Sequence, residues 1–352
     1  QYSLGDEAIS NPEHQTTPES TIVQEKLYQM VENGCEFAVV ESSSHGLSKR
    51  TNRLGDVDFD VGVMMNVTSE HLEFHGTYEQ YRDDKANLFE NLNLFGVVNG
   101  DDKASSLFAS KTEKPVYSFI KDKTSAKEIF TENYFMTDIK SDAKGEDFSL
   151  EVINQCDIKK LEDFRIDLPG TFNVYNSTAA AIVVSKLLNI TLEELKPALK
   201  ALTPVKGRMT VVDEGQDFEV IVDYAHTPSS FETIFPPLRK RCQGKMIAVF
   251  GSGGERDLTK RPLQGQIAAQ YCDTVILADE DPRGENPEEL LKMIEIEKLN
   301  YKYLDSYLVA VCFNVVIKQR IVKNFDFTKI ANCKRLGIRS RIEYWVLREE
   351  SK

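Results

Sequence analysis

Acidic, hydroxyl and imidazole side chains gather in two short segments, each directly after an apolar run. The first segment, residues 41–46, has the sequence ESSSHG, and the second, residues 66–76, has the sequence NVTSEHLEFHG. A carboxylate such as that of Glu41, at the tip of a strand, could bind Mg²⁺, a hard cation that prefers oxygen ligands. Three serines and a glycine also fit an ordinary turn, so spacing alone leaves both interpretations open.

The two histidines of the second segment, His71 and His75, are four residues apart, so a helix would place both imidazoles on one face. That spacing suggests a zinc hydrolase, whose motif needs a glutamate directly after the first histidine as the general base. Leu72 stands at that position, which weakens the zinc interpretation. The alternative is that one of the two histidines lies in a helix cap and the other packs against neighbouring side chains. Lys85, in the helical segment that follows, has by itself the character of a solvated surface lysine.

A glycine-rich loop, FGSGGERD, occupies residues 250–257 between an apolar run and a helical segment. Its glycines would let backbone amides approach an anion, and the N-terminus of the helix favours negative charge. Arg256 stands where a dinucleotide-binding GxGxxG loop needs glycine, so support for a dehydrogenase is weak. A guanidinium at this position suits a carboxylate or phosphate, which it can bind through two parallel hydrogen bonds.

Two α/β series must position these segments, and we place the boundary between them near residue 203. Buried parallel strands are predicted at residues 37–40, 61–65 and 95–98 in the first series and at 220–222, 246–250 and 275–278 in the second. Helices are predicted at residues 18–33, 78–92, 173–188 and 262–271, and a less regular polar region at about 103–165. Ligands of open parallel sheets lie beyond the carboxyl ends of the strands, so the polar segments of each series should converge at one edge.

The composition argues against several classes of protein. A formal net charge of −13 over 352 residues gives no positive field to hold nucleic acid or an anionic membrane. The longest apolar stretch, residues 307–317, is much shorter than the roughly 20 residues of a membrane span, and the first residues lack the pattern of a secretory signal. Six scattered cysteines without a CxxC pair indicate reduced thiols. We therefore expect a cytoplasmic protein with no nucleic-acid or membrane partner.

The last part of the sequence differs in character from the rest. Residues 295–352 hold 12 Lys and Arg against 7 Asp and Glu, whereas residues 1–294 hold 31 against 49. The same stretch has one glycine, no proline and the only tryptophan. We interpret it as foreign to the preceding α/β series, produced by a frameshift or by joining to another reading frame.

Taken together, the segments resemble the Mur ligases, and within that family the MurE type, the UDP-N-acetylmuramoyl-tripeptide synthetases. The resemblance covers about residues 1–294 and rests on motifs in the family's order: TTPES, ESSSHGL, NVTSEHLEFHG, YRDDKANLF, LPGTFNVYNSTAA, KGRM, VDYAHTP, FGSGGERDLTKRP and DEDPRGE. It implies an α/β fold with a central ATPase-type parallel-sheet domain over residues 1–203. A Rossmann-like C-terminal domain would span residues 204–294, followed by a non-family tail over 295–352.

The activity that the resemblance implies is ATP-dependent ligation in peptidoglycan synthesis. ATP would phosphorylate the peptide carboxylate of UDP-MurNAc-L-Ala-D-Glu, and the amine of a free diamino acid would attack the acyl phosphate. The implied cofactor is Mg²⁺, with ATP as co-substrate, and the implied state is a monomer. A folylpolyglutamate-type ligase, which shares the architecture, and a non-catalytic remnant that binds the precursor or ADP are the alternatives.

The resemblance also assigns roles to individual residues. Glu41, His71 and a carbamylated Lys85 would hold the metal ions, and Thr16, Thr17, Ser43 and Arg53 would contact the precursor. Asn173, Arg208, Asp223 and Lys260 would lie around the nucleotide. Arg256 and the loop Glu280, Asp281, Pro282 and Arg283 would hold the incoming amino acid.

Two departures from the family pattern shape these expectations. Asp281 replaces the asparagine usual in ligases that add meso-diaminopimelate. An acid suits an ω-ammonium group and favours L-lysine or L-ornithine as the added amino acid. Because Arg283 is present, meso-diaminopimelate is the other candidate. The family's Gly-Lys-Thr phosphate loop and Gly-Lys-Gly-His-Glu motif do not occur among these residues, so we expect this chain to be inactive alone.

Overall fold

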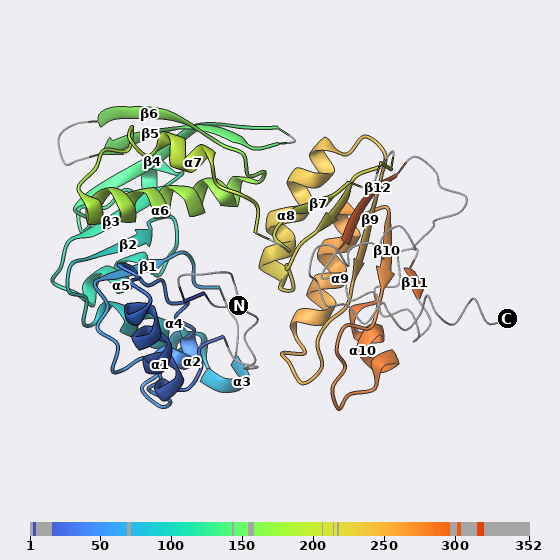
Figure 1. Ribbon diagram of the computed structural model, residues 1–352. Helices are drawn as coiled ribbons and strands as arrows, with labels where there is room; N and C mark the ends of the chain where they lie inside the picture. The colour runs from blue at the N-terminus through green and yellow to red at the C-terminus, as the bar shows by residue number, and fades with distance from the viewer. Residues whose placement is uncertain are drawn as a thin grey trace. The chain divides into compact units, whose positions relative to one another are not determined.

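The computed structural model describes residues 3–4, 16–68, 72–142, 144–153, 158–205, 207–213, 215–216, 218–295, 301–303 and 315–319. The chain divides into two compact units (Figure 1). The first comprises residues 1–167 and 173–201, and the second comprises residues 168–172 and 202–352. Each unit is built around one six-stranded sheet. The division at Ala201 lies beside the predicted boundary at residue 203.

The first sheet has its strands in sequence order, from β1 at one edge to β6 at the other. Strands β1 (Val61–Met64), β2 (Phe95–Asn99), β3 (Val116–Ile120) and β4 (Glu132–Ser141) pair in parallel. Strands β5 (Glu146–Ile153) and β6 (Ile158–Ile166) continue the sheet in antiparallel pairs. The strands predicted at 61–65 and 95–98 are thus confirmed as neighbours in a parallel-dominated α/β sheet.

Two predictions for the first unit are wrong. Residues 37–40 form no strand, and the side chains of Phe37 and Val39 are 55% and 96% exposed. An apolar run becomes a buried strand only beside a pairing partner, and in the described part of the chain β1 pairs with β2 alone. Residues 103–165 are regular rather than irregular, because β3 to β6 lie there. Strands β4 and β5 hold exposed and partly buried residues beside their buried ones, which accounts for the polar composition of the region.

The helices of the first unit include α1 (Ser20–Glu32), α2 (Ser44–Leu47), α3 (Leu72–His75), α4 (Tyr78–Ala86), α5 (Ser105–Ser110), α6 (Thr171–Leu188) and α7 (Lys196–Lys200). Short 3₁₀ turns lie at Asn87–Phe89 and Lys123–Ser125. Helices α4 and α5 share a core with β1 to β3, in which the rings of Phe89 and Phe108 meet edge to face at 5.2 Å. This packing fixes α4 against the sheet.

The second sheet has the order β11-β10-β9-β12-β8-β7. Its strands are β7 (Thr210–Val212), β8 (Val220–Val222), β9 (Lys245–Phe250), β10 (Thr274–Leu277), β11 (Tyr301–Tyr303) and β12 (Val315–Gln319). Strand β12 pairs antiparallel with both β8 and β9, while β9, β10 and β11 are parallel. Strands β8, β9 and β10 therefore end at the same edge. Two strands of this sheet, β11 and β12, come from residues that we assigned to a foreign tail.

Helices α8 (Pro228–Arg241), α9 (Lys260–Tyr271) and α10 (Pro287–Ile294) pack on the second sheet around one apolar core. Helix α8 begins with a capping box, in which Thr227 and Ser230 exchange side-chain and backbone hydrogen bonds. Asn286 caps α10 by accepting from two backbone amides. Within the described residues, no helix is both long enough and apolar enough to cross a membrane.

Candidate functional site

Four of the residues assigned to precursor and metal binding lie in one polar cluster of the first unit. The buried Thr17 hydroxyl donates to the Glu41 carbonyl at 3.1 Å and accepts from the Ser43 hydroxyl at 2.8 Å. Arg53 donates from Nη1 to the Thr17 carbonyl at 3.1 Å. Its buried Nε has no hydrogen-bond partner within the described part of the chain. The Thr17 hydroxyl thus holds the Glu41 loop. Thr16 is exposed beside it.

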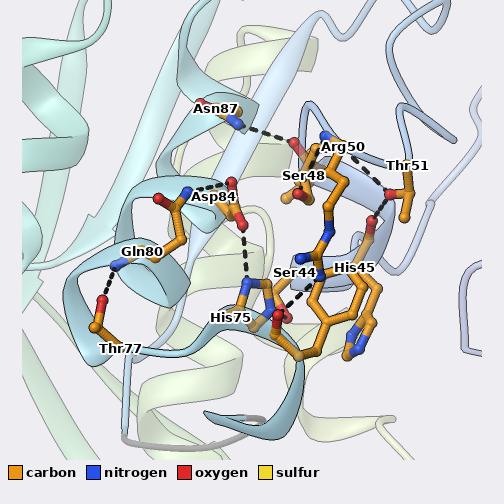
Figure 2. A network of polar contacts seen from close by, with 12 residues as sticks. Ser44, His45, Ser48, Arg50, Thr51, His75, Thr77, Gln80, Asp84 and Asn87 are labelled. Carbon is orange, nitrogen blue, oxygen red and sulfur yellow. Dashed lines mark hydrogen bonds and ion pairs between the residues drawn. The ribbon is translucent and has the colours of Figure 1, made fainter.

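A second network, shown in Figure 2, joins the loop after Glu41 to helix α4. His75 lies with Nδ1 2.8 Å from Asp84 Oδ2 and with Nε2 3.0 Å from Ser44 Oγ. Its side chain is fully buried. Gln80 donates to the other oxygen of Asp84 at 3.0 Å, and Asn87 donates to the Leu47 carbonyl at 2.9 Å. These bonds fix α2 against α4.

The geometry of His75 weakens the zinc-hydrolase alternative. Nδ1 lies at hydrogen-bond distance from Asp84 and Nε2 from Ser44, so neither ring nitrogen is available to a metal ion. Among the described residues, no group of three His, Cys, Asp or Glu side chains is placed to hold a metal. His71 lies outside the described residues. Sequence reasoning missed the role of His75 because its partners, Ser44 and Asp84, are distant along the chain.

Glu41 and Lys85 lie on the two elements that this network connects. The Glu41 carboxylate is exposed and has no hydrogen-bond or ion-pair partner in the part of the chain that the structure describes. Magnesium is commonly held by one or two carboxylates together with substrate phosphates, so a single open carboxylate fits this ion. Lys85 is half-buried on α4, next to Asp84, with Nζ 5.2 Å from the Tyr81 ring centre.

In the second unit, the loops after β9 and β10 lie against each other. We call residues 251–257 the glycine loop and residues 279–285 the acidic loop. The Gly254 amide donates to the Asp281 carbonyl at 2.8 Å. A Cβ on Gly254 would lie 1.9 Å from the Pro282 carbonyl oxygen, so the contact requires glycine. The structure thus brings Arg256 and Arg283, one on each loop and both exposed, to one edge of the sheet.

Carboxylates and cations face one another at this edge. Burial raises the pKa of Glu280, while the nearby charges of Lys260 and His226 oppose that rise. Burial also raises the pKa of Asp279, with the charge of Asp281 acting in the same direction. Asp281 forms an ion pair with Arg283 at 3.6 Å, and both side chains reach solvent. The edge could therefore bind a ligand that carries both an ammonium and a carboxylate.

The residues assigned to the nucleotide are divided between the units. Asn173 lies in α6 of the first unit, whereas Arg208, Asp223 and Lys260 belong to the second. Asp223 is buried, and its two oxygens accept from the Met209 and Ala225 amides at 2.8 and 2.7 Å. The Arg208 guanidinium lies 4.9 Å from the Tyr224 ring centre, and Lys260 is the first residue of α9. Contact of these residues with a nucleotide stays a prediction.

Comparison with known families gives two matches. Residues 2–184 match the Mur ligase middle domain, and residues 207–316 match the Mur ligase glutamate ligase domain. The second match extends past residue 295, where we predicted that a foreign tail begins. The domain boundaries and the extent of that tail stay predictions.

Individual relatives agree with these matches. The chain is 51% identical to a UDP-N-acetylmuramyl-tripeptide synthetase of Treponema denticola, over 84% of this chain and 57% of the relative. It is 39% identical to a UDP-N-acetylmuramoyl-L-alanyl-D-glutamate–2,6-diaminopimelate ligase of Caldanaerobacter subterraneus, over 86% of this chain and 60% of the relative. A solved structure of a ligase of the latter name has 28% identity and a TM-score of 0.53, covering 82% of this chain and 58% of that chain. The chain thus spans a little over half the length of these relatives.

Proposed function

This chain belongs to the Mur ligase family, and from that premise we propose that it carries the ligation chemistry of a MurE-type enzyme. The proposed reaction adds a diamino acid to UDP-MurNAc-L-Ala-D-Glu in the cytoplasm, where ATP and the nucleotide-linked precursor are found. ATP transfers its γ-phosphoryl group to the peptide carboxylate. The amine then attacks the acyl carbon, an amide bond forms and phosphate leaves. The ordered pairing of the Glu41 loop with α4 is the observation that best supports this proposal.

Thr17, Ser43 and Arg53 are proposed to position the precursor. Hydrogen bonds join Thr17 to Ser43 and to the Glu41 backbone, and Arg53 donates to the Thr17 carbonyl, so these side chains form one fixed surface. The buried Nε of Arg53, which has no partner among the described residues, gives this guanidinium an additional donor near that surface. A fixed cluster of donors lowers the entropy cost of orienting the acyl group for attack.

Glu41, His71 and Lys85 are proposed to hold magnesium. Carbon dioxide would add to the neutral Lys85 amine, and loss of one proton would leave a carbamate with oxygen ligands. Bound Mg²⁺ would neutralise charge on the transferring phosphoryl group. The role of the His75 and Asp84 network is to keep the Glu41 loop and the Lys85 helix together.

The loops of the second unit are proposed to hold the incoming amino acid. Arg256 and Arg283 supply guanidinium groups for its carboxylate, and Asp281 supplies a carboxylate for its ω-ammonium. This charge pattern favours L-lysine or L-ornithine, and meso-diaminopimelate is the second candidate because Arg283 could bind its additional carboxylate.

Isothermal titration with UDP-MurNAc-L-Ala-D-Glu tests the proposed substrate. The full chain should bind this precursor, and Arg53→Gln should weaken binding by at least about tenfold, which corresponds to roughly 1.4 kcal/mol. Arg50→Gln is the matched control, because Arg50 donates to the Phe74 carbonyl and stacks on its ring instead of contacting Thr17. Binding of a folylpolyglutamate and not of the precursor would contradict the assignment and favour the alternative ligase.

A phosphate-release assay tests the expectation that these 352 residues are inactive alone. With ATP, Mg²⁺, the precursor and each of the three diamino acids, we expect no turnover above background. Precursor binding without turnover would agree with the non-catalytic alternative for this chain. Robust phosphate release that requires a diamino acid would refute the expectation of inactivity.

A further inference from the structure

One carboxylate connects the glycine loop, the acidic loop and helix α9. Glu285, at the end of the acidic loop, accepts hydrogen bonds from Arg261 Nη1 at 2.7 Å and Nη2 at 2.9 Å. It also accepts from the backbone amide of Glu255 in the glycine loop. Arg261 Nη2 donates in addition to the Gly253 carbonyl at 3.3 Å. Removal of this carboxylate would therefore leave the two loops joined only by their backbone contact at Gly254 and would detach both from Arg261.

The ion pair between Arg261 and Glu285 is placed to hold the two loops in fixed positions. Arg261 is 0% exposed, and its planar guanidinium binds a carboxylate in one defined orientation. The hydrogen bonds from Arg261, and secondarily from the Glu255 amide, lower the pKa of Glu285 to about 2. Glu285 is thus ionised at neutral pH. Because three donors already occupy its two oxygens, Glu285 is poorly suited to bind a ligand directly.

Backbone conformation supports a positioning role. Glu255 and Arg283 have φ values of 52° and 51°, in the left-handed region that is unfavourable for residues other than glycine. Such conformations persist where surrounding contacts fix them. Glu255 donates its amide to Glu285, and Arg283 lies two residues before Glu285 in the same loop. The conformation of each loop is thus coupled to the ion pair.

We propose that Glu285, held by Arg261, is a positioning residue that fixes the glycine and acidic loops relative to each other, so that Arg256 and Arg283 act on one amino-acid ligand. This inference rests on the proposed function, in which the two loops bind the incoming diamino acid. The positioning residue acts through the loops and does not contact the ligand.

Amide hydrogen exchange and ligand titration on the full chain test the proposal together. In Glu285→Gln, the amides of Gly254 and Glu255 should exchange at least about tenfold faster, because a charge-assisted pair is lost. Affinity for the diamino acid that the wild type binds best should fall about tenfold, while affinity for the UDP precursor should change less than twofold. Arg261→Lys keeps the charge but loses the planar fork, so it should give a smaller change in the same direction.

Asp273→Asn is the matched control. Asp273 also accepts from an arginine, Arg239, at 2.7 Å and from a backbone amide, that of Met246, at 2.7 Å. Met246 lies near the start of β9, away from the strand ends that carry the two loops. This variant should leave the loop exchange rates and the diamino-acid affinity within twofold of wild type.

The outcomes separate this inference from the proposed function. If the loop amides of Glu285→Gln exchange at the wild-type rate, the coupling of the loops is refuted, and this holds whichever ligand the chain binds. If exchange accelerates but diamino-acid affinity is unchanged, the positioning role is refuted. If the wild type binds none of the three diamino acids, the proposed substrate class fails, and the exchange rates still decide the coupling.

Discussion

The loops of the second unit follow strands that pair on both sides, whereas the Glu41 loop of the first unit follows a segment that pairs with no strand among the described residues. Strands β9 and β10 are parallel neighbours in register, and their following loops meet through the Gly254–Asp281 backbone hydrogen bond and through Glu285, which also pairs with Arg261 of α9. Residues 37–39 are exposed and Val40 is half-buried, and the loop after them is held by the side chains of Thr17 and His75. A polar segment that follows an apolar run can thus be positioned either by a sheet or by a side-chain network.

The largest expected effect comes from removing the network of the first unit. His75→Ala would leave the buried Asp84 and Ser44 without their imidazole partner, and we expect a loss of about 2–4 kcal/mol in the free energy of unfolding. The control is Asp83→Ala, whose exposed ion pair with Arg82 should contribute less than about 1 kcal/mol. Urea unfolding of both variants measures the difference. Equal losses would mean that His75 does not hold the Glu41 loop.

In the second unit, the backbone contact between the loops should make Gly254 sensitive to substitution by alanine and leave its neighbour Gly253 tolerant of the same substitution. Gly254→Ala would place a Cβ 1.9 Å from the Pro282 carbonyl oxygen, and the required backbone shift should cost about 1–3 kcal/mol. Gly253→Ala meets nothing closer than the Arg256 side chain at 3.7 Å and should change stability by less than about 0.5 kcal/mol. Thermal unfolding compares the two variants. A tolerated Gly254→Ala would argue against the close approach of the loops.

The ion pair of the second unit should give a pH dependence that the Glu285→Gln variant lacks. The pKa of Glu285 falls from an ordinary value of 4.5 to about 2 in the folded chain, chiefly because of Arg261. Its stabilising contribution is therefore complete above about pH 4.5 and is lost as the pH falls toward 2. Urea midpoints of wild type and variant should differ most at neutral pH and approach each other below pH 4. A difference that stays constant with pH would contradict the assignment.

The smallest expected effect tests whether residues 37–40 lack a sheet partner in this chain. Val39→Ala should change the free energy of unfolding by less than about 0.5 kcal/mol, because the Val39 side chain is 96% exposed. The same change at Val97, which is 0% exposed in β2, should cost about 2 kcal/mol. If both substitutions cost the same, the Val39 side chain is packed, which would contradict its exposure.

Much of the second sheet could be predicted because its strands are apolar on both faces. The runs at 220–222, 246–250 and 275–278 became β8, β9 and β10 with at most one residue of difference at each end. The region 103–165 could not be predicted in this way, because its strands β4 and β5 are only partly buried and carry many polar residues. Residues 37–40 have the right pattern for a strand, but a pattern does not report whether a pairing partner is present.

The sequence by itself determined the family, the α/β class and the placement of polar loops after β9 and β10, because motifs and apolar periodicity are local properties. Tertiary structure alone decided which polar residues pair. His75 meets Ser44 across 31 positions and Asp84 across 9, and Arg261 meets Glu285 across 24. No spacing rule connects such residues, since a buried hydrogen bond depends on which side chains the packed elements bring within about 3 Å of each other.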